Sequence, residues 1–352
     1  MNSINPSSLS VDPDILGPID TLPAPRFDHL RRLTDHLGLW EHARFTTPRP
    51  EHGYCTDDNA RALIVVCRQP NPSAELIGMG RIYFRFVEDA ALPQGGFHNR
   101  RTANDSWGDE VGSDDSQGRA IWCLGAAARL GPEGWMRRAA LDLFDRQGDF
   151  SSSSPRANAF ATLGASEVLT GDPGHAPAQE ALSRWADHLQ VSYDPAWPWP
   201  ERRLAYDNAR IPEALMAAGA ALGDDRFVEE GLRLLEWLVT IEANDDHFSF
   251  TPAGGWARGE PRPGYDQQPV EAAAMADACS RAWLLTRDGK WRDNVLRAAG
   301  WLIGRNDGNV VLYDHETGGC CDGLTPRGPN LNQGAESTLS GLSALQQARM
   351  VA

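Results

Sequence analysis

The chain carries two kinds of apolar segment, and they alternate along its length. In the first kind, apolar residues recur at helical spacing with charged residues between them, which predicts amphipathic α-helices that bury one face. These segments run from Phe27 to Trp40, Leu76 to Ala91, Trp135 to Phe144, Ala178 to Val191, Phe227 to Ile241 and Trp291 to Ile303.

The second kind of segment is rich in alanine, apolar on nearly all sides, and opened by a cluster of polar residues. A helix of this composition must be covered on most of its surface. The polar clusters recur roughly every 45 to 65 residues, and such a period is typical of an array of repeated units. They begin at Thr56 (TDDNAR), Gly112 (GSDDSQGR), Ser153 (SSPRAN), Tyr206 (YDNAR), Tyr265 (YDQQP) and Asn332 (NQGAES).

This alternation predicts helical hairpins, each with one amphipathic outer helix and one alanine-rich inner helix. We expect six of them to close into an all-α (α/α)6 toroid in which the N-termini of the inner helices line one pocket. An open solenoid of helix pairs would show the same period, but it gives no reason for polar clusters at the inner N-termini. We assign residues 1–25 to an extended N-terminal arm and residues 26–352 to a single barrel domain.

Composition limits the partners of this ring. The formal net charge of −15 argues against nucleic acid or an anionic membrane. No apolar run reaches the roughly 18 to 20 residues of a membrane helix, and the first residues lack the features of a signal peptide. The six cysteines form no CxxC pair. We therefore expect a cytoplasmic protein without a metal or another cofactor, and its charge fits a neutral or cationic small substrate.

Two inner helices open with adjacent aspartates that are followed by an arginine. One aspartate of each pair can cap its helix, and its neighbour then points elsewhere because adjacent helical residues do not share a face. That second aspartate either reaches the pocket or pairs with the following arginine. The candidate substrate-binding residues of these two starts are Asp57, Asp58, Asn59, Arg61, Asp114, Gln117 and Arg119.

Two further starts place a tyrosine directly before an acid and one or two amides. Asn, Gln and Arg beside carboxylates can hydrogen-bond many hydroxyls at once, as sugar recognition requires. A set of solvated helix caps is the alternative. The candidate residues here are Tyr206, Asp207, Asn208, Arg210, Tyr265, Asp266, Gln267, Gln268 and Glu271.

The last inner helix has a single acid, Glu336, near its start. The helix dipole stabilises a carboxylate there, and an ionised glutamate suits a general base. Alternatively, Glu336 completes a capping arrangement with Asn332 or Gln333, which are themselves candidate contacts. The third start, residues 153–158, has no acid.

Aromatic and histidine side chains fall in the loops before the inner helices. Flat aromatic faces stack on pyranose rings, and histidines can transfer protons near neutral pH. The candidate contacts from these loops are His52, Tyr54, His98, Trp199 and Trp256.

From Phe27 to the C-terminus, the chain resembles the six-hairpin, (α/α)6-barrel carbohydrate-active enzymes. The strings HGYCTDDNARAL, YDNARIPEAL, YDQQPVEAA and NQGAEST are similar to those of bacterial glycosyltransferase-associated α/α proteins. The resemblance implies a glycoside hydrolase that acts on an oligosaccharide by inverting acid/base hydrolysis. Carried over by position, it makes Asp207 the candidate acid and Glu336 the candidate base, with Asp115 and Asp266 as substitutes.

Two other functions remain open at this point. Sugar isomerases of the N-acylglucosamine 2-epimerase type resemble the chain in hairpin count, but they rely on paired histidines where this chain carries carboxylates. An essential His98 or His247 would favour them. A non-catalytic sugar-binding domain of a glycan-building system would need the same sugar contacts without a definite acid and base.

Overall fold

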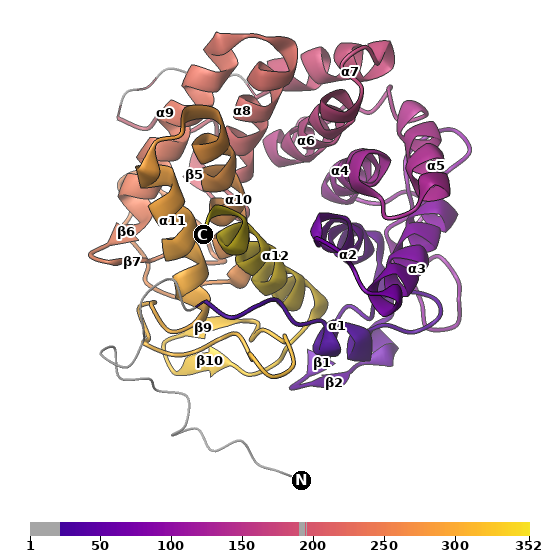
Figure 1. Cartoon of the computed structure of the whole chain (residues 1–352). Helices are drawn as coiled ribbons and strands as arrows, with labels where there is room; N and C mark the ends of the chain where they lie inside the picture. The colour runs from indigo at the N-terminus through magenta and orange to yellow at the C-terminus, as the bar shows by residue number, and fades with distance from the viewer. Residues whose placement is uncertain (1–21, 190–193, 195) are drawn as a thin grey trace.

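A computed structural model of the chain describes residues 22–189, 194 and 196–352. Over these residues, an inner and an outer ring of helices surround one axis, and the predicted (α/α)6 toroid is confirmed (Figure 1). The inner helices are α2 (Thr56–Arg68), α4 (Asp114–Leu130), α6 (Pro155–Gly171), α8 (Arg210–Leu222), α10 (Pro269–Thr286) and α12 (Ala335–Val351). The outer helices are α1 (Asp28–Leu33), α3 (Ala74–Ala90), α5 (Gly134–Asp145), α7 (Ala176–Asp187), α9 (Asp225–Glu242) and α11 (Gly289–Leu302).

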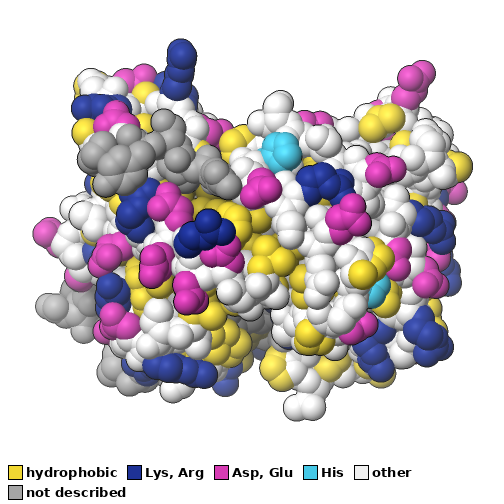
Figure 2. All heavy atoms as spheres, turned by 90° about the horizontal axis from the view of Figure 1, so that it is seen from above, with side chains coloured by type: hydrophobic (Ala, Val, Ile, Leu, Met, Phe, Trp, Pro, Cys, Tyr) yellow, Lys and Arg dark blue, Asp and Glu magenta, His cyan; other side chains and the backbone are white. Residues whose placement is uncertain are grey.

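The inner ring is closed. Each inner helix contacts the next one, and α12 returns to contact α2, so the open solenoid is excluded. Burial follows the two sequence patterns. In α6 the run from Arg156 to Leu169 is buried throughout, whereas α9 buries leucines on one face and exposes charges on the other. Figure 2 shows acidic and basic side chains interspersed over one outer side of the molecule.

Small residues let neighbouring inner helices approach closely. A Cβ added to Gly125 of α4 would lie 2.0 Å from the carbonyl oxygen of Gly164 in α6, and one added to Gly164 would lie 2.5 Å from the carbonyl oxygen of Ile121. Either substitution would force the two backbones apart. The alanine and glycine content of these segments therefore sets the width of the ring.

Several predicted helix boundaries differ from the structure. The first amphipathic segment is helical only to Leu33, because the Asp35 carboxylate accepts hydrogen bonds from the N–H groups of Leu37 and Gly38 and forms a turn. The inner helices α8 and α10 begin four residues after their tyrosines, at Arg210 and Pro269. Their polar clusters thus lie in the turns that lead into the helices. Of the predicted arm, residues 1–21 lie outside the described part. The helix predicted to reach Val191 ends at Asp187 with His188 as its C-cap, and Val191 itself lies outside the described residues.

Short antiparallel strand pairs join the helices. They are β1 (Ala43–Arg44) with β2 (Thr47–Pro48), β3 (Tyr54–Cys55) with β4 (Arg100–Arg101), β5 (Arg203–Leu204) with β8 (Trp256–Ala257), β6 (Ala243–Asn244) with β7 (His247–Phe248), and β9 (Gly323–Thr325) with β10 (Gly328–Asn330). A 3-10 turn, η4, spans Pro50–His52. Among the described residues, no helix is long and apolar enough to cross a membrane.

Candidate functional site

A cavity of about 360 Å³ opens where α2 and α12 begin and where the chain enters α10, and we call it the mouth cavity. Its volume falls in the range of about 300–1,000 Å³ that is usual for small-molecule sites. Acidic side chains dominate its wall. The lining residues are Glu41, His42, Cys55, Asp57, Asp58, Arg61, Asn99, Arg100, Gln268, Asp322, Asn330, Gly334, Glu336 and Ser337.

The start of α2 is capped by a cysteine. Cys55 is the N-cap in extended conformation, and its Sγ accepts a hydrogen bond from the Asp58 N–H and donates one to Asp58 Oδ2. The prediction that one aspartate caps this helix is therefore wrong. Because Cys55 already fills the capping position, Asp57 and Asp58 lie in the first helical turn, where the helix dipole favours acids.

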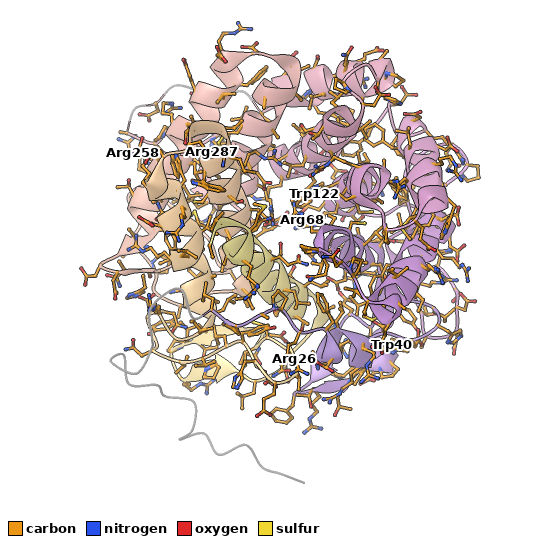
Figure 3. The ribbon with its side chains drawn as sticks, in the orientation of Figure 1. Arg26, Trp40, Arg68, Trp122, Arg258 and Arg287 are labelled. Atoms are coloured by element: carbon orange, nitrogen blue, oxygen red, sulfur yellow. The ribbon has the colours of Figure 1, made fainter. Side chains whose placement is uncertain are left out.

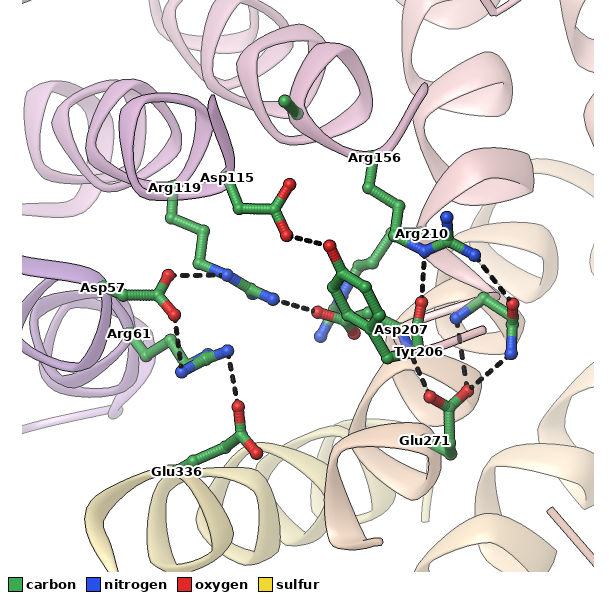
Figure 4. Close-up of polar contacts among 12 residues, drawn as sticks. Asp57, Arg61, Asp115, Arg119, Arg156, Tyr206, Asp207, Arg210, Glu271 and Glu336 are labelled. Atoms are coloured by element: carbon green, nitrogen blue, oxygen red, sulfur yellow. Dashed lines mark hydrogen bonds and ion pairs between the residues drawn. The ribbon is translucent and has the colours of Figure 1, made fainter. Parts of the chain in front are cut away.

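Arg61 joins the acids of two helices. Its Nη1 lies 2.9 Å from Asp58 Oδ1 and 3.2 Å from Asp57 Oδ2, and its Nη2 lies 2.8 Å from Glu336 Oε2 (Figure 4). One guanidinium thus spans the first and last inner helices. Because it binds both, the carboxylates of Asp58 and Glu336 are at most about 8 Å apart. Glu336 keeps 40% of its side chain exposed, so solvent reaches it.

Two acids of the mouth cavity bind their protons more tightly than usual. Burial raises the pKa of Asp58 to about 7; Arg61 opposes this rise, while Asp57 and Glu336 add to it. Burial also raises the pKa of Asp322, although the Gly334 N–H lowers it. A carboxyl group with a pKa near 7 can donate or accept a proton at neutral pH.

Asp207, the predicted acid, lies deeper, on the barrel axis. It is fully buried and lines a separate cavity of about 30 Å³, which has room for water but not for a sugar ring. Arg119 Nη2 lies 2.6 Å from its Oδ2 and Arg210 Nε lies 3.2 Å from its Oδ1. Burial raises the pKa of Asp207, but Arg119, Arg210 and Arg61 together bring it below the ordinary value. These surroundings favour an ion-paired anion.

The ion pairs around Asp207 belong to a chain that crosses the ring. Arg119 of α4 binds Asp57 of α2 at 2.7 Å as well as Asp207. Arg210 continues to Asp277 of α10, and Arg68 of α2 binds Asp277 at 3.0 Å. Figure 3 places Arg68 at the centre of the ring, beside Trp122. Charged side chains therefore fill the axis below the mouth cavity.

The start of α4 differs from that of α2. Ser113 caps the helix through its hydroxyl, so the expected aspartate cap is wrong here too. Asp114 accepts a hydrogen bond from the Ser152 hydroxyl at 2.5 Å, and Asp115 accepts one from the Tyr206 hydroxyl. The two acids therefore bind neighbouring loops, and the following arginine turns to α2 and Asp207.

Glu271, a predicted substrate contact, stabilises the turn that precedes α8. Its carboxylate accepts hydrogen bonds from the backbone N–H groups of Asp207 and Asn208, and also from the Asn208 side chain at 3.2 Å. Asp207 has a φ of 51°, in the left-handed region. Glu271 thus fixes the turn that directs Asp207 toward Arg119. Burial and the nearby Glu242 and Asp207 raise the pKa of Glu271 well above its usual value.

Several other candidate contacts lie inside the wall. The Tyr54 hydroxyl donates to Asp35 at 2.8 Å, and Asn59 connects the Leu39 N–H with the Cys55 carbonyl. These side chains hold the loops that shape the cavity. The predicted residues with such buried positions are Tyr54, Asn59, Gln117, Trp199, Asn208, Gln267 and Gln333.

The remaining candidates lie at the rim. His98 stacks on Trp107 with ring centroids 5.0 Å apart, and its Nδ1 bonds the Asp109 carbonyl at 2.7 Å. Trp256 packs edge-on against Trp197. Asn332 accepts a hydrogen bond from a backbone N–H. His52, Tyr265 and Asp266 are exposed.

Sequence reasoning missed eight polar residues of the mouth cavity, which are Glu41, His42, Cys55, Asn99, Arg100, Asp322, Asn330 and Ser337. Glu41 and Asp322 lie in loops that share no repeated pattern, and Arg100 lies in a β-strand pair. Cys55 directly precedes TDDNAR, and its position before a helix start was the one available signal.

Glu41, Cys55 and Asp58 have ligand atoms within 4.8 Å of one another, a spacing that a metal ion could use. Two cations already compete for this position. Arg61 binds Asp58, and Arg100 forms an ion pair with Glu41. Burial raises the pKa of Cys55 well above its usual value, so the thiol form is favoured over the thiolate that metals bind.

Comparisons with known proteins agree on the fold. No protein family and no curated sequence matches the chain. Among solved structures, a sugar epimerase from a ruminal bacterium matches with a TM-score of 0.73 and 13% identity, over 94% of this chain and 98% of the other. The cellobiose 2-epimerase of Bacillus thermoamylovorans matches with a TM-score of 0.71 and 10% identity, over 93% and 96%.

A third similar structure is an α-1,6-mannanase of family GH76 from Salegentibacter, with a TM-score of 0.59 and 13% identity over 92% of this chain and 96% of the other. It is an inactive variant in which two consecutive aspartates are replaced by alanine, in complex with an α-1,6-linked mannose tetrasaccharide. At these identities the comparisons show the fold that this chain shares with sugar epimerases and a mannanase.

Proposed function

We propose that this chain is a glycoside hydrolase that cleaves an oligosaccharide in the mouth cavity. One observation carries the proposal: Asp58, with a pKa raised to about 7, and the ion-paired Glu336 lie on either side of Arg61 in a cavity large enough for sugar. Two carboxyl groups with separate protonation states are the requirement for acid/base hydrolysis of a glycosidic bond.

In the proposed reaction, Asp58 is the acid. Its carboxylic acid donates a proton to the glycosidic oxygen as the bond from that oxygen to the anomeric carbon breaks. Glu336 removes a proton from a water molecule, whose oxygen forms the new bond to the anomeric carbon. The upper bound of about 8 Å on their separation admits the spacing of inverting enzymes as well as the shorter spacing of retaining ones. We propose inversion of configuration because the resemblance to six-hairpin glycosidases implies it.

Asp58 replaces Asp207 as the proposed acid for two physical reasons. Asp207 lines a cavity that is too small for a sugar, and its two arginine partners stabilise the ionised form. Asp58 lines the larger cavity, where burial favours the protonated form. In this proposal Asp207 holds Arg119 and Arg210 in place, while Asp115 and Asp266 lie outside the reacting centre.

The mannanase supports the proposal by analogy. Its inactive variant lacks two consecutive aspartates, and two inner helices of this chain begin with such a pair, Asp57–Asp58 in α2 and Asp114–Asp115 in α4. The overall negative charge of the chain fits a neutral oligosaccharide rather than an acidic one.

A sugar epimerase is the second candidate, because two epimerases are among the similar structures. Proton transfer at a sugar carbon would then fall to Asp58, Glu336 or His42, the histidine that lines the mouth cavity. His98 and His247, the histidines that would favour this candidate, have other partners: the Asp109 carbonyl for His98, and Asp307 at 2.9 Å for His247.

Incubation with an α-1,6-linked mannose tetrasaccharide and with cellobiose, followed by chromatography and mass spectrometry, separates these functions. Hydrolysis gives shorter saccharides and incorporates one oxygen from labelled water, whereas epimerisation gives a new sugar of unchanged mass. Hydrolysis of any member of a wider glycan panel, abolished in Asp58→Asn and Glu336→Gln, supports the proposal. Sugar binding without turnover by the wild-type chain across that panel would contradict it and favour a non-catalytic binding domain.

A further inference from the structure

A larger pocket, of about 840 Å³, lies at the far end of the ring from the mouth cavity. We call it the basal pocket. It is bounded by the C-terminal ends of α2, α4, α6, α10 and α12, and by Ala24 and Pro25 before α1. Figure 1 shows this segment passing close to the C-terminal end of α12. Neither the sequence motifs nor the proposed hydrolysis involves this pocket.

Some charges of the basal pocket are already neutralised by neighbours. Arg68 lies 3.0 Å from Asp277, and Arg129 forms an ion pair with Glu167. These pairs belong to the wall. Because Arg68 and Arg129 are neutralised in this way, neither of them needs a ligand as a counter-ion.

Three hydrogen-bond donors of the pocket are left over. Arg281 lies 3.5 Å from one oxygen of Glu213, whose other oxygen binds Arg210 at 2.7 Å, and its Nε is buried without a hydrogen-bond partner among the described residues. Ser280 is 2% exposed, and its Oγ has no hydrogen-bond partner in the part of the chain that the structure describes. Arg349 is exposed and forms no ion pair or hydrogen bond within the part of the chain that the structure describes. A ligand rich in hydrogen-bond acceptors could satisfy these three donors.

One acceptor is also unused. The side chain of Gln346 donates to the Val65 carbonyl and to Gln69, each at 3.0 Å, which fixes the orientation of its amide. Its Oε1 is buried and has no partner within residues 22–189, 194 and 196–352. A hydroxyl group is the simplest donor for this oxygen.

We propose that the basal pocket binds a small hydroxylated anion, such as a sugar phosphate or a sugar acid. The anionic group lies on Arg281 and Arg349, Ser280 donates a further hydrogen bond, and a ligand hydroxyl donates to Gln346 Oε1. Arginine forks match phosphate and carboxylate geometry. The proposal is independent of hydrolysis in the mouth cavity.

Two features oppose anion binding and set its expected strength. The C-terminal ends of helices carry partial negative charge, and the whole chain has a formal charge of −15. The attraction of an anion to Arg281 and Arg349 must exceed the repulsion from the helix ends and from the net charge. Binding is therefore expected to be weak at physiological ionic strength and to strengthen at low salt.

Isothermal titration calorimetry on the full chain at low salt tests the proposal, with glucose 6-phosphate, gluconate, inorganic phosphate and neutral glucose as probes. Glucose 6-phosphate or gluconate should bind saturably, more tightly than phosphate, and glucose should not bind at this site. Arg281→Gln should weaken binding about tenfold or more, and Arg349→Gln should weaken it in the same direction. Arg85→Gln, on an exposed arginine of outer helix α3, is the matched control and should change nothing.

The variant Glu336→Gln distinguishes anion binding in the basal pocket from anion binding in the mouth cavity. This variant should bind the anion as the wild type does, because Glu336 lines the mouth cavity. The proposal is overturned if neither hydroxylated anion binds at millimolar concentration, or if both arginine variants, folded by circular dichroism, bind as tightly as the wild type. Loss of anion binding in Glu336→Gln would place the ligand at the mouth and contradict it as well.

Discussion

The inner helices α2 and α4 begin with nearly the same sequence and have different surroundings. Both have two adjacent aspartates in the first turn, and in both a residue before the pair provides the cap. In α2, Asp58 is 3% exposed, faces the mouth cavity and has a pKa of about 7. In α4, Asp115 is only half-buried and is hydrogen-bonded to Tyr206.

The difference comes from what covers each helix start. Burial of the α2 start raises the proton affinity of Asp58, and the charges of Asp57, Glu336 and Glu41 add to the rise. The α4 start faces a tyrosine and a serine, which donate hydrogen bonds to its acids. A motif therefore supplies the carboxyl groups, while the neighbouring loops decide their protonation and access.

Neutralising the buried acid should have the largest effect. Asp58→Asn removes the proposed proton donor and should lower kcat by about 10²- to 10⁴-fold, because general acid catalysis contributes that much. Asp115→Asn, the equivalent change on α4, should lower kcat by less than about tenfold. Steady-state kinetics on an identified oligosaccharide checks both. Equal losses in the two variants would remove the proposed difference between the helix starts.

Removing the cation between the two helix starts should destabilise the fold. Arg119→Met leaves the fully buried Asp207 with one arginine fewer and should cost about 3–5 kcal/mol in the free energy of unfolding. Urea denaturation followed by circular dichroism measures this. Arg85→Met on the surface of α3 should stay within about 0.5 kcal/mol of the wild type. A loss below about 1 kcal/mol in Arg119→Met would contradict the account of the axial ion pairs.

The raised pKa of Asp58 should make stability depend on pH. The folded chain keeps this proton up to about pH 7, whereas the unfolded chain, with a pKa of 3.8, releases it near pH 4. Raising the pH between these values therefore favours unfolding, by at most about 1.4 kcal/mol per pH unit from this group. Asp58→Asn should lose this contribution, so the difference in unfolding free energy between variant and wild type should grow in the variant's favour as the pH rises. A difference that is constant from pH 4 to 7 would rule out the raised pKa.

The smallest effect is expected from a substitution at the start of α4. Tyr206→Phe removes one hydrogen bond from Asp115, on a ring that is 40% exposed, and should cost about 1 kcal/mol or less in the free energy of unfolding. Denaturation under the same conditions checks this. A cost above about 3 kcal/mol would show that the α4 start is as strongly coupled to the core as that of α2.

The fold could be predicted because its signal repeats. Alanine-rich and amphipathic segments alternate along the chain, and each alternation reports the same physical demand for burial. The site could be predicted only in part. Asp58, Arg61 and Glu336 belong to the repeated helix starts, whereas Glu41 and Asp322 reach the mouth cavity from loops without a pattern.

The assignments that the structure does not favour have a common cause. Sequence shows that a residue lies at a helix start, but it does not show depth along the axis. The resemblance to six-hairpin glycosidases makes Asp207 the candidate acid, yet a left-handed turn held by Glu271 directs it toward two arginines. Likewise, Cys55 and Ser113 precede the aspartates and take the caps.

A crystal structure of Glu336→Gln with a bound oligosaccharide tests the central claim most directly. The account predicts a sugar ring in the mouth cavity, with the glycosidic oxygen within hydrogen-bond distance of Asp58 and the anomeric carbon between Asp58 and the substituted side chain. A sugar bound against Asp115 and Tyr206 at the α4 start, with the mouth cavity empty, would contradict it.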